Sequence, residues 1–254
     1  MSMRILDAGD AAFTVEFGDA IDPALLARVN ALDTGIARLQ AGGGLPGLIE
    51  TMPTFRSLTV FFDPLQTGRE ALLVELAPFL ADTAASAGDL GRHWRLPVCY
   101  EGELAPDLGQ TAAALGIATD DVVALHAGRD YVVYMLGFLP GFPFMGDVPE
   151  ALRLPRRAEP RLRVPAGSVA VANGLTAIYP WESPGGWHLL GRCPVPLFDA
   201  ACPSPSLLAA GDSVRFEPVS MTEYRRLLDA ATAGELDPQQ WLATAAANDG
   251  GGAQ

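Results

Sequence analysis

The segment from Tyr131 to Phe198 constrains the fold more than any other part of this chain, because it is dense in proline, glycine and arginine. Within it, Pro155, Pro160 and Pro165 recur at a spacing of five residues. Each proline fixes its own φ and biases the preceding residue toward an extended backbone. This stretch therefore cannot be helical, and we expect it to run extended.

Arginines are interleaved with these prolines: Arg153, Arg156, Arg157, Arg161 and Arg163. The guanidinium group is permanently charged and presents a planar fork that suits carboxylate or phosphate. One interpretation is that at least one arginine, though not all five, lines an anion site. The other is a solvated edge segment whose charges discourage sheet pairing and pair with acids elsewhere.

Composition narrows the choice of partners. The 254 residues carry a net charge of -13 and are 49% hydrophobic, which fits a globular protein, and we expect two domains. A strongly acidic chain lacks the basic footprint that nucleic acid or an anionic membrane requires. A local excess of arginine in such a chain points to a small anion.

The basic residues are also informative because all 17 are arginine. The absence of lysine excludes a Schiff-base lysine, a P-loop lysine and a biotinylated lysine on this chain. Cys99, Cys193 and Cys202 are scattered, so we expect neither a disulfide framework nor a metal site. No charged and then apolar leader follows Met1, and we expect a cytoplasmic protein without membrane insertion.

Residues 1–90 are expected to form a small N-terminal α+β domain of the α/β sandwich kind. An N-cap and N1 proline at Asp22-Pro23 precede an apolar stripe at helical spacing through Leu39. Alternating strands flank that stripe, and a second helix follows around 72–80. Both helices are expected on one face of the sheet. The small, polar stretch 82–91 is the expected linker.

Residues 91–230 are expected to form a second domain dominated by β structure. The pair Asn173-Gly174 lies between two apolar runs and is a strong hairpin signal. Short helices are expected at 107–115 and 120–126, and a last helix is expected to follow Ser220. A barrel is the natural closure because it removes sheet edges. Residues 231–254 are expected to be a partly disordered tail.

Two histidines are candidates for chemistry. His126 ends its expected helix, where the helix dipole favours the imidazolium form. It can be an acid, a base or a ligand donor, or it can cap the last helical carbonyls, and both interpretations stay open. His188 lies in an expected strand and is expected to be a surface residue.

Two turns are candidates for shaping a site. The loop at 137–143 repeats a Gly-Phe-Pro pattern, and Phe138, Phe142 and Phe144 either wall a ligand or plug a barrel end. The turn at 183–187, Ser-Pro-Gly-Gly-Trp, either offers backbone amides to an anion or only reverses the chain. Glu182 and Ser183 are polar groups beside it.

These motifs, taken in order, resemble the family called allophanate hydrolase subunit 1. The resemblance rests on His126, the 137–143 loop, Pro-Arg-Arg at 155–157, Arg-Val-Pro-Ala-Gly-Ser at 163–168, the 183–187 turn and Gly191-Arg192. It extends to Pro-Asp-Leu at 106–108 and covers nearly everything but the tail. The family includes the B-type subunit of 5-oxoprolinase and a Kip-type inhibitor of a sporulation histidine kinase.

The resemblance implies an α+β fold in which a small N-terminal domain precedes a cyclophilin-like β-barrel. It further implies a subunit of an ATP-dependent 5-oxoprolinase, which opens 5-oxo-L-proline to L-glutamate and is inactive alone. The implied partners are a cyclophilin-like subunit of the subunit 2 or C type and a barrel-type A subunit. ATP would be bound by, or shared with, a partner.

The resemblance also implies roles for particular residues. The catalytic set is His126, Arg161 and Arg163. The substrate-binding set is Arg157, Tyr179, Gly185, Gly186, Trp187 and Arg192. In this picture the arginines bind carboxylate or phosphate and His126 shuttles a proton. Cys193 departs from the family pattern, which has threonine there, so a hydroxyl role at that position is in doubt.

Three other functions stay open on the residues alone. The chain can be a regulator that inhibits a sensor histidine kinase, which requires an exposed apolar patch. It can also be the carboxyltransferase half of a urea or allophanate type system, with biotin carried on another chain. Prolyl isomerase activity rests on barrel analogy alone.

Overall fold

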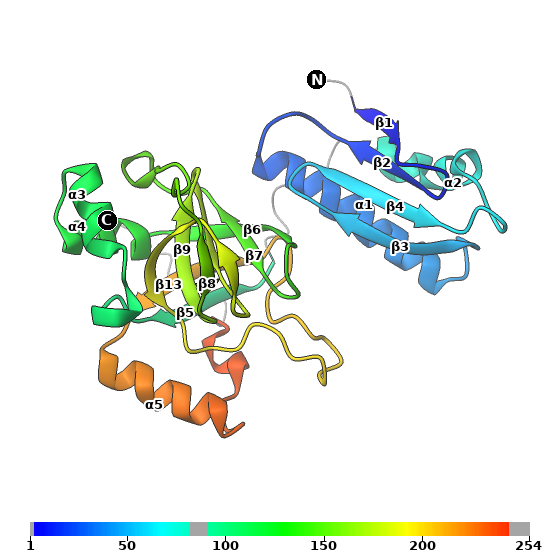
Figure 1. Cartoon of the computed structure of the whole chain (residues 1–254). Coiled ribbons are helices and arrows are strands. Elements are labelled where there is room, and N and C mark those ends of the chain that lie inside the picture. Colours follow the sequence, from blue (N-terminus) through cyan, green and yellow to red (C-terminus); the bar gives the residue numbers. More distant parts are fainter. Residues whose placement is uncertain (1–2, 82–90, 244–254) are drawn as a thin grey trace, which may run out of the picture. The chain divides into compact units, whose positions relative to one another are not determined.

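The computed structural model describes residues 3–81 and 91–243 of the chain. It divides into two compact units, Met1–Leu90 and Gly91–Gln254, and each is described by itself (Figure 1). Residues 82–90 of the expected linker lie outside the described residues. In the described part, no helix combines the length and the apolar character needed to cross a membrane.

The first unit is a four-stranded antiparallel sheet with the strand order β1-β2-β4-β3. Its strands are β1 (Arg4–Asp7), β2 (Ala12–Glu16), β3 (Leu48–Pro53) and β4 (Ser57–Phe62). The burial of β4 alternates along the strand, as expected for a sheet with one covered face.

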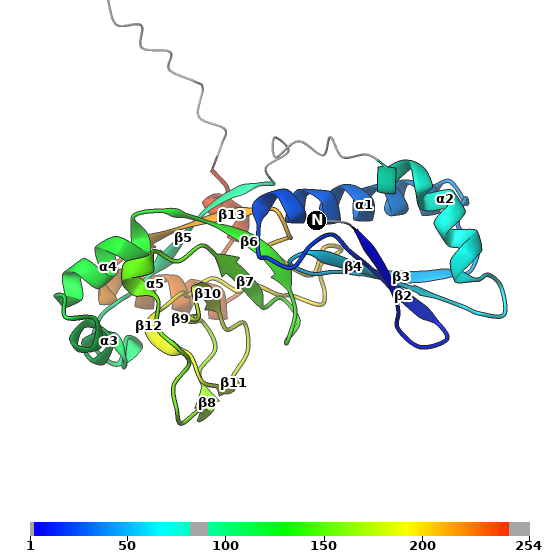
Figure 2. The ribbon, with the colours of Figure 1, turned by 90° about the horizontal axis from the view of Figure 1, so that it is seen from above.

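Two helices cover that face: α1 (Pro23–Ala41) and α2 (Arg69–Ala81) (Figure 2). The Asp22 side chain accepts a hydrogen bond from the Ala24 N–H at 2.7 Å, which confirms the expected cap. The core between the layers is apolar and contains Phe13, Val15, Val29, Leu32, Ile36, Leu58, Val60, Leu72 and Leu76.

The second unit is built on a seven-stranded sheet with the order β12-β9-β10-β7-β6-β13-β5. Its strands are β5 (His93–Val98), β6 (Asp130–Leu136), β7 (Pro143–Gly146), β9 (Ser168–Ala172), β10 (Leu175–Ile178), β12 (His188–Arg192) and β13 (Ser213–Pro218). A separate two-stranded sheet pairs β8 (Arg161–Val164) with β11 (Ser183–Gly185).

The seven-stranded sheet closes on itself. Its end strands β5 and β12 meet where Cys99 and Arg192 exchange two backbone hydrogen bonds of 2.9 Å. The enclosed core is apolar and includes Trp94, Leu96, Val98, Tyr131, Val133, Val169, Val171, Ile178, Leu190, Val214 and Phe216. The expected α+β class, with a small layer preceding a barrel, is therefore confirmed.

The hairpin signal is also confirmed, because β9 and β10 are antiparallel neighbours joined at Asn173 and Gly174. Both residues adopt positive φ, 51° and 80°. Such angles are the requirement of a tight hairpin turn that matches the sheet twist.

The helices of the second unit are α3 (Leu108–Leu115), α4 (Thr119–Ala127) and α5 (Met221–Thr232), with short 3-10 turns η1 (Gly102–Leu104), η2 (Glu150–Leu152) and η3 (Pro238–Trp241). The domain boundary expected at residue 230 falls inside α5 and needs correction. The Ala243 N–H donates to the His93 carbonyl at 2.8 Å, and Trp241 and Leu242 pack on the core. The unit therefore extends at least to Ala243, while residues 244–254 of the expected tail lie outside the described residues.

Candidate functional site

A buried carboxylate organises the arginine-rich segment. The Asp107 side chain, directly before α3, is 3% exposed. Its Oδ1 accepts hydrogen bonds from Arg157 Nη1 at 3.1 Å and from Arg161 Nη2 at 2.5 Å. Its Oδ2 accepts from the Leu189 N–H at 2.7 Å. Three segments far apart in the sequence thus meet at one carboxylate.

The extended backbone expected from the prolines produces this meeting. The Arg157 N–H donates to the Gly186 carbonyl at 2.7 Å, and Arg161 pairs with Gly185 between β8 and β11. The arginine segment therefore runs alongside the 183–187 turn. Pairing with that turn places two guanidinium groups, four residues apart, on the same acid.

The charges of this cluster do not cancel. Two guanidinium groups share one carboxylate, so one positive charge is left over. About a quarter of each arginine side chain is exposed, and in the described part of the chain Arg157 Nε and Arg161 Nη1 are buried without a hydrogen-bond partner. A surplus guanidinium with unused donors is the arrangement that binds a small anion. The Asp107 cluster, meaning Asp107, Arg157 and Arg161, is our candidate site.

Tyr179 lies next to this cluster, just after β10 (Leu175–Ile178). Burial raises the pKa of the Tyr179 hydroxyl, while the positive charges of Arg156 and Arg161 act in the opposite direction. The hydroxyl therefore stays protonated near neutral pH and can donate a hydrogen bond. An ideal Cβ added at Gly185 would lie 2.4 Å from the Tyr179 oxygen.

Replacing Gly185 with alanine should destabilise the second unit by roughly 1–3 kcal/mol, because the added methyl group overlaps a buried ring that has no room to move. Gly186→Ala is the matched control, since its nearest atom is Pro160 Cβ at 3.5 Å, an ordinary contact. Urea unfolding of both variants measures the difference. Equal stability of the two variants would contradict this account of Gly185.

Trp187 belongs to an aromatic cluster beneath the 183–187 turn. Phe142 makes T-shaped contacts with Tyr179 and Trp187 at ring distances of 5.0 and 6.3 Å. Phe142 is buried and plugs this end of the barrel, whereas Phe138 is 65% exposed. The plug interpretation of the 137–143 loop thus fits Phe142 and does not fit Phe138.

His126 does not reach the Asp107 cluster. The Thr176 hydroxyl donates to the Ala170 carbonyl, so it accepts from His126 Nε2 at 2.9 Å. Nδ1 then accepts from the Tyr100 hydroxyl at 2.8 Å. The ring stacks on Phe216 with a centroid distance of 4.7 Å. A neutral imidazole satisfies both contacts.

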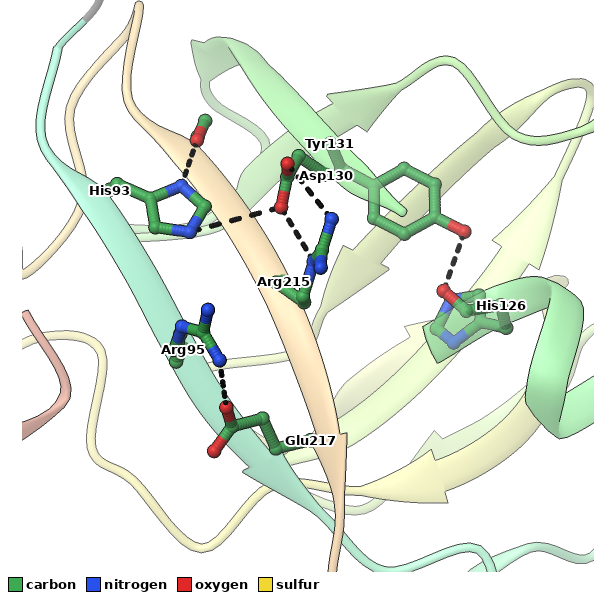
Figure 3. Close-up of polar contacts among 8 residues, drawn as sticks. His93, Arg95, His126, Asp130, Tyr131, Arg215 and Glu217 are labelled. Atoms are coloured by element: carbon green, nitrogen blue, oxygen red, sulfur yellow. Dashed lines mark hydrogen bonds and ion pairs between the residues drawn. The ribbon is translucent and has the colours of Figure 1, made fainter. Parts of the chain in front are cut away.

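The imidazolium form expected for His126 is therefore wrong. Its side chain is fully buried, and burial lowers the pKa of His126 to about 3. Figure 3 shows the Tyr131 hydroxyl donating to the His126 backbone carbonyl, so the imidazole does not cap the helix either. With no exposed surface, this ring neither contacts a ligand nor exchanges a proton with one in this structure.

The remaining candidate residues lie apart from the Asp107 cluster. Arg163 is 78% exposed and pairs with Glu182 through two hydrogen bonds of 2.8 and 3.0 Å. Arg192 is half-buried and bonds the Tyr224 hydroxyl of α5. His188, expected on the surface, is half-buried with Nε2 2.9 Å from the Pro155 carbonyl. The structure thus brings together Arg157, Arg161, Tyr179, Gly185 and Gly186, with Trp187 beneath them.

Other polar features of the second unit differ from this cluster. Figure 3 shows a ladder on β5, β6 and β13 in which Asp130 contacts His93 and Arg215, and Arg95 contacts Glu217. Every cation of this ladder faces a carboxylate on the surface. Among the described residues, no group of three or more His, Cys, Asp or Glu side chains is placed to hold a metal ion.

An open pocket of about 570 Å³ lies between α3, α4 and the segment before α5. Its lining includes Tyr100, Glu101, Thr119 and Val219. It contains none of the residues of the Asp107 cluster.

The comparisons with known proteins place this chain in a family. The family described as carboxyltransferase domain, subdomain C and D, matches residues 3–208. The chain belongs to this carboxyltransferase family. The match includes every residue of the Asp107 cluster and the 183–187 turn.

Two curated relatives of this carboxyltransferase-family chain are both named as the B-type subunit of 5-oxoprolinase. The chain is 37% identical to the relative from Bacillus subtilis (strain 168) over 231 residues, which are 87% of this chain and 95% of the relative. It is 42% identical to the relative from Escherichia coli O157:H7 over 174 residues, which are 68% of this chain and 79% of the relative.

Solved structures extend the comparison. The crystal structure of TTHA0988 superimposes with a TM-score of 0.72 at 40% identity, covering 82% of this chain. The family member described here spans only 40% of that solved chain's length. The K. lactis urea amidolyase gives a TM-score of 0.72 at 22% identity, over 92% of this chain and 16% of that one, which shows the shared fold alone.

Proposed function

We propose that this chain is the B-type subunit of an ATP-dependent 5-oxoprolinase, which opens 5-oxo-L-proline to L-glutamate. The names of the curated relatives and the broad coverage of their length support the proposal. The observation that carries it is the Asp107 cluster, a partly exposed pair of arginines with one uncompensated positive charge. 5-Oxo-L-proline bears a carboxylate that is ionised near neutral pH and matches that charge.

The reaction breaks the C–N bond of the lactam ring, and water supplies the oxygen of the new carboxylate. A lactam is a poor electrophile, and ATP supplies the activation. On this chain, Arg157 and Arg161 bind and orient the substrate carboxylate. The protonated Tyr179 hydroxyl donates a hydrogen bond beside them, and the aromatic cluster of Trp187 and Phe142 forms an apolar wall.

The residues present do not fit ATP itself. The chain has no lysine, and the single surplus charge of the Asp107 cluster falls far short of a triphosphate. We therefore assign ATP to a partner subunit, and no catalytic step of ATP is assigned to this chain. The proposed partners are a C-type cyclophilin-like subunit and a barrel-type A subunit. The cytoplasmic location expected from the sequence stays a prediction.

Reconstitution with one component omitted tests the proposed function. The chain is purified with its C-type and A-type partners, and glutamate formed from 5-oxo-L-proline is measured with and without ATP. We expect glutamate only with ATP and all three chains, and none from this chain alone. Unchanged glutamate formation without this chain, or none from the complete assembly, would contradict the proposal.

Carboxyl transfer is the second candidate, because the family description names a carboxyltransferase domain. The same arginine pair suits a carboxylated substrate, while biotin must sit on another chain because this one has no lysine. Incorporation of labelled bicarbonate into urea by an assembly containing a biotin carrier would favour this candidate. Glutamate formation without bicarbonate or biotin would exclude it for the assembly tested.

A further inference from the structure

We propose that Asp107 is the positioning residue of the anion site, holding Arg157 and Arg161 in the geometry that binds a small monoanionic carboxylate. This inference rests on the proposed function and deepens it. Asp107 itself is not offered as a catalytic residue, because its carboxylate is buried and fully engaged by the protein.

Asp107 is locked in place from two directions. Its backbone N–H donates to the Leu189 carbonyl at 3.1 Å, and the Leu189 N–H returns a hydrogen bond to its Oδ2 at 2.7 Å. This reciprocal pair fixes Asp107 on β12. The remaining oxygen, Oδ1, then has one position, and both guanidinium groups converge on it. The rigid sheet thereby sets the spacing of two otherwise flexible side chains.

Charge indicates the class of ligand. The cluster holds one negative and two positive charges, so a monoanion brings the buried group to neutrality. A phosphate dianion would leave an excess negative charge beside a buried carboxylate, which is unfavourable where solvent screening is weak. The cluster is therefore better matched to a carboxylate than to a phosphoryl group.

Two roles for Asp107 predict opposite outcomes. If Asp107 only neutralised charge, Asp107→Asn would increase the positive charge and tighten anion binding. If Asp107 positions the arginines, the same variant loosens binding, because an amide holds two guanidinium groups poorly. Asp107→Glu keeps the charge but moves the carboxylate by one methylene. It therefore leaves affinity unchanged in the first case and weakens it in the second.

Calorimetric titration of the full chain tests the inference, with 5-oxo-L-proline, the neutral lactam 2-pyrrolidinone and inorganic phosphate as probes. We expect 5-oxo-L-proline to bind and the other two to bind at least about tenfold more weakly. Both Asp107 variants should lose affinity roughly ten- to hundredfold, the value of a charge-assisted hydrogen bond.

Asp212→Asn is the matched control. Asp212 is also buried and accepts hydrogen bonds from Arg92 and the Trp94 indole, but it lies outside the Asp107 cluster. This variant should lose stability without losing affinity. If Asp107→Asn does not fold, Asp107→Glu carries the test, with thermal unfolding as the check on folding.

The outcomes separate this inference from the proposed function. No binding of 5-oxo-L-proline, tighter binding by Asp107→Asn, or unchanged affinity in Asp107→Glu would overturn the inference. If the assembly still forms glutamate in such a case, the proposed function survives. If binding behaves as expected but the complete assembly forms no glutamate, the anion site stands and the proposed function fails.

Discussion

Replacing Arg161 with alanine should lower kcat/KM for glutamate formation by the assembled enzyme at least about a hundredfold. The change removes the surplus positive charge, because Asp107 then faces Arg157 alone. It also removes a donor from the partly exposed face that the substrate carboxylate is proposed to contact. A loss of this size matches removal of a charge-assisted hydrogen bond of about 3 kcal/mol.

Arg215→Ala is the matched control for that variant. Arg215 also pairs with a carboxylate through two hydrogen bonds, to Asp130 at 2.8 and 3.1 Å, but it belongs to the exposed ladder of Figure 3. Its loss should change kcat/KM less than about twofold, since exposed pairs contribute little. The account of Arg161 fails if both variants keep normal activity, or if Arg161→Ala loses activity only because the complex no longer assembles.

Acid should destabilise the second unit through His126. Burial lowers the pKa of this imidazole to about 3 in the folded state, against an ordinary value of about 6.5 when unfolded. Between these values only the unfolded state binds the proton, so stability is complete above about pH 6.5 and falls as the pH decreases toward 3. The free energy of unfolding should decrease by roughly 1 kcal/mol per pH unit within this window.

Urea unfolding between pH 7 and about pH 4 measures this slope, and His126→Gln identifies its source. The glutamine variant is less stable at pH 7 but should show a flatter pH dependence, because it has no titrating group at that position. His188→Gln is the control, since His188 is only half-buried. An unchanged slope in His126→Gln would show that other groups dominate the acid response.

Much of the fold could be predicted from the sequence because its signals are local. The cap at Asp22 and the hairpin at Asn173 and Gly174 depend on residues close in the chain, and both are found where expected. The extended course of the arginine segment follows from proline geometry alone. Barrel closure is less local, because it joins Cys99 to Arg192, and only the cost of open edges argued for it.

The site was harder to predict because its contacts join distant residues. Asp107 is one of 30 acidic residues, and its partners lie 50, 54 and 82 positions away. The available signals were its place in the Pro-Asp-Leu motif at 106–108 and the expectation that arginines pair with acids. Neither signal identifies which acid the arginines bind.

The arginines and His126 show two further limits of sequence reasoning. Arg161 and Arg163 are neighbours on β8, yet one meets Asp107 and the other pairs with Glu182. The position of the partner acids, set by tertiary structure, decides this. For His126, the helix dipole was the visible effect, whereas the burial that dominates its pKa depends on residues from four other segments.

The most direct test of the central claim is a structure of the complete assembly with 5-oxo-L-proline bound. Our account predicts the substrate carboxylate within hydrogen-bond distance of both Arg157 and Arg161, with Asp107 still holding the two arginines from behind. A substrate bound elsewhere, with Arg157 and Arg161 contacting only Asp107, would contradict it.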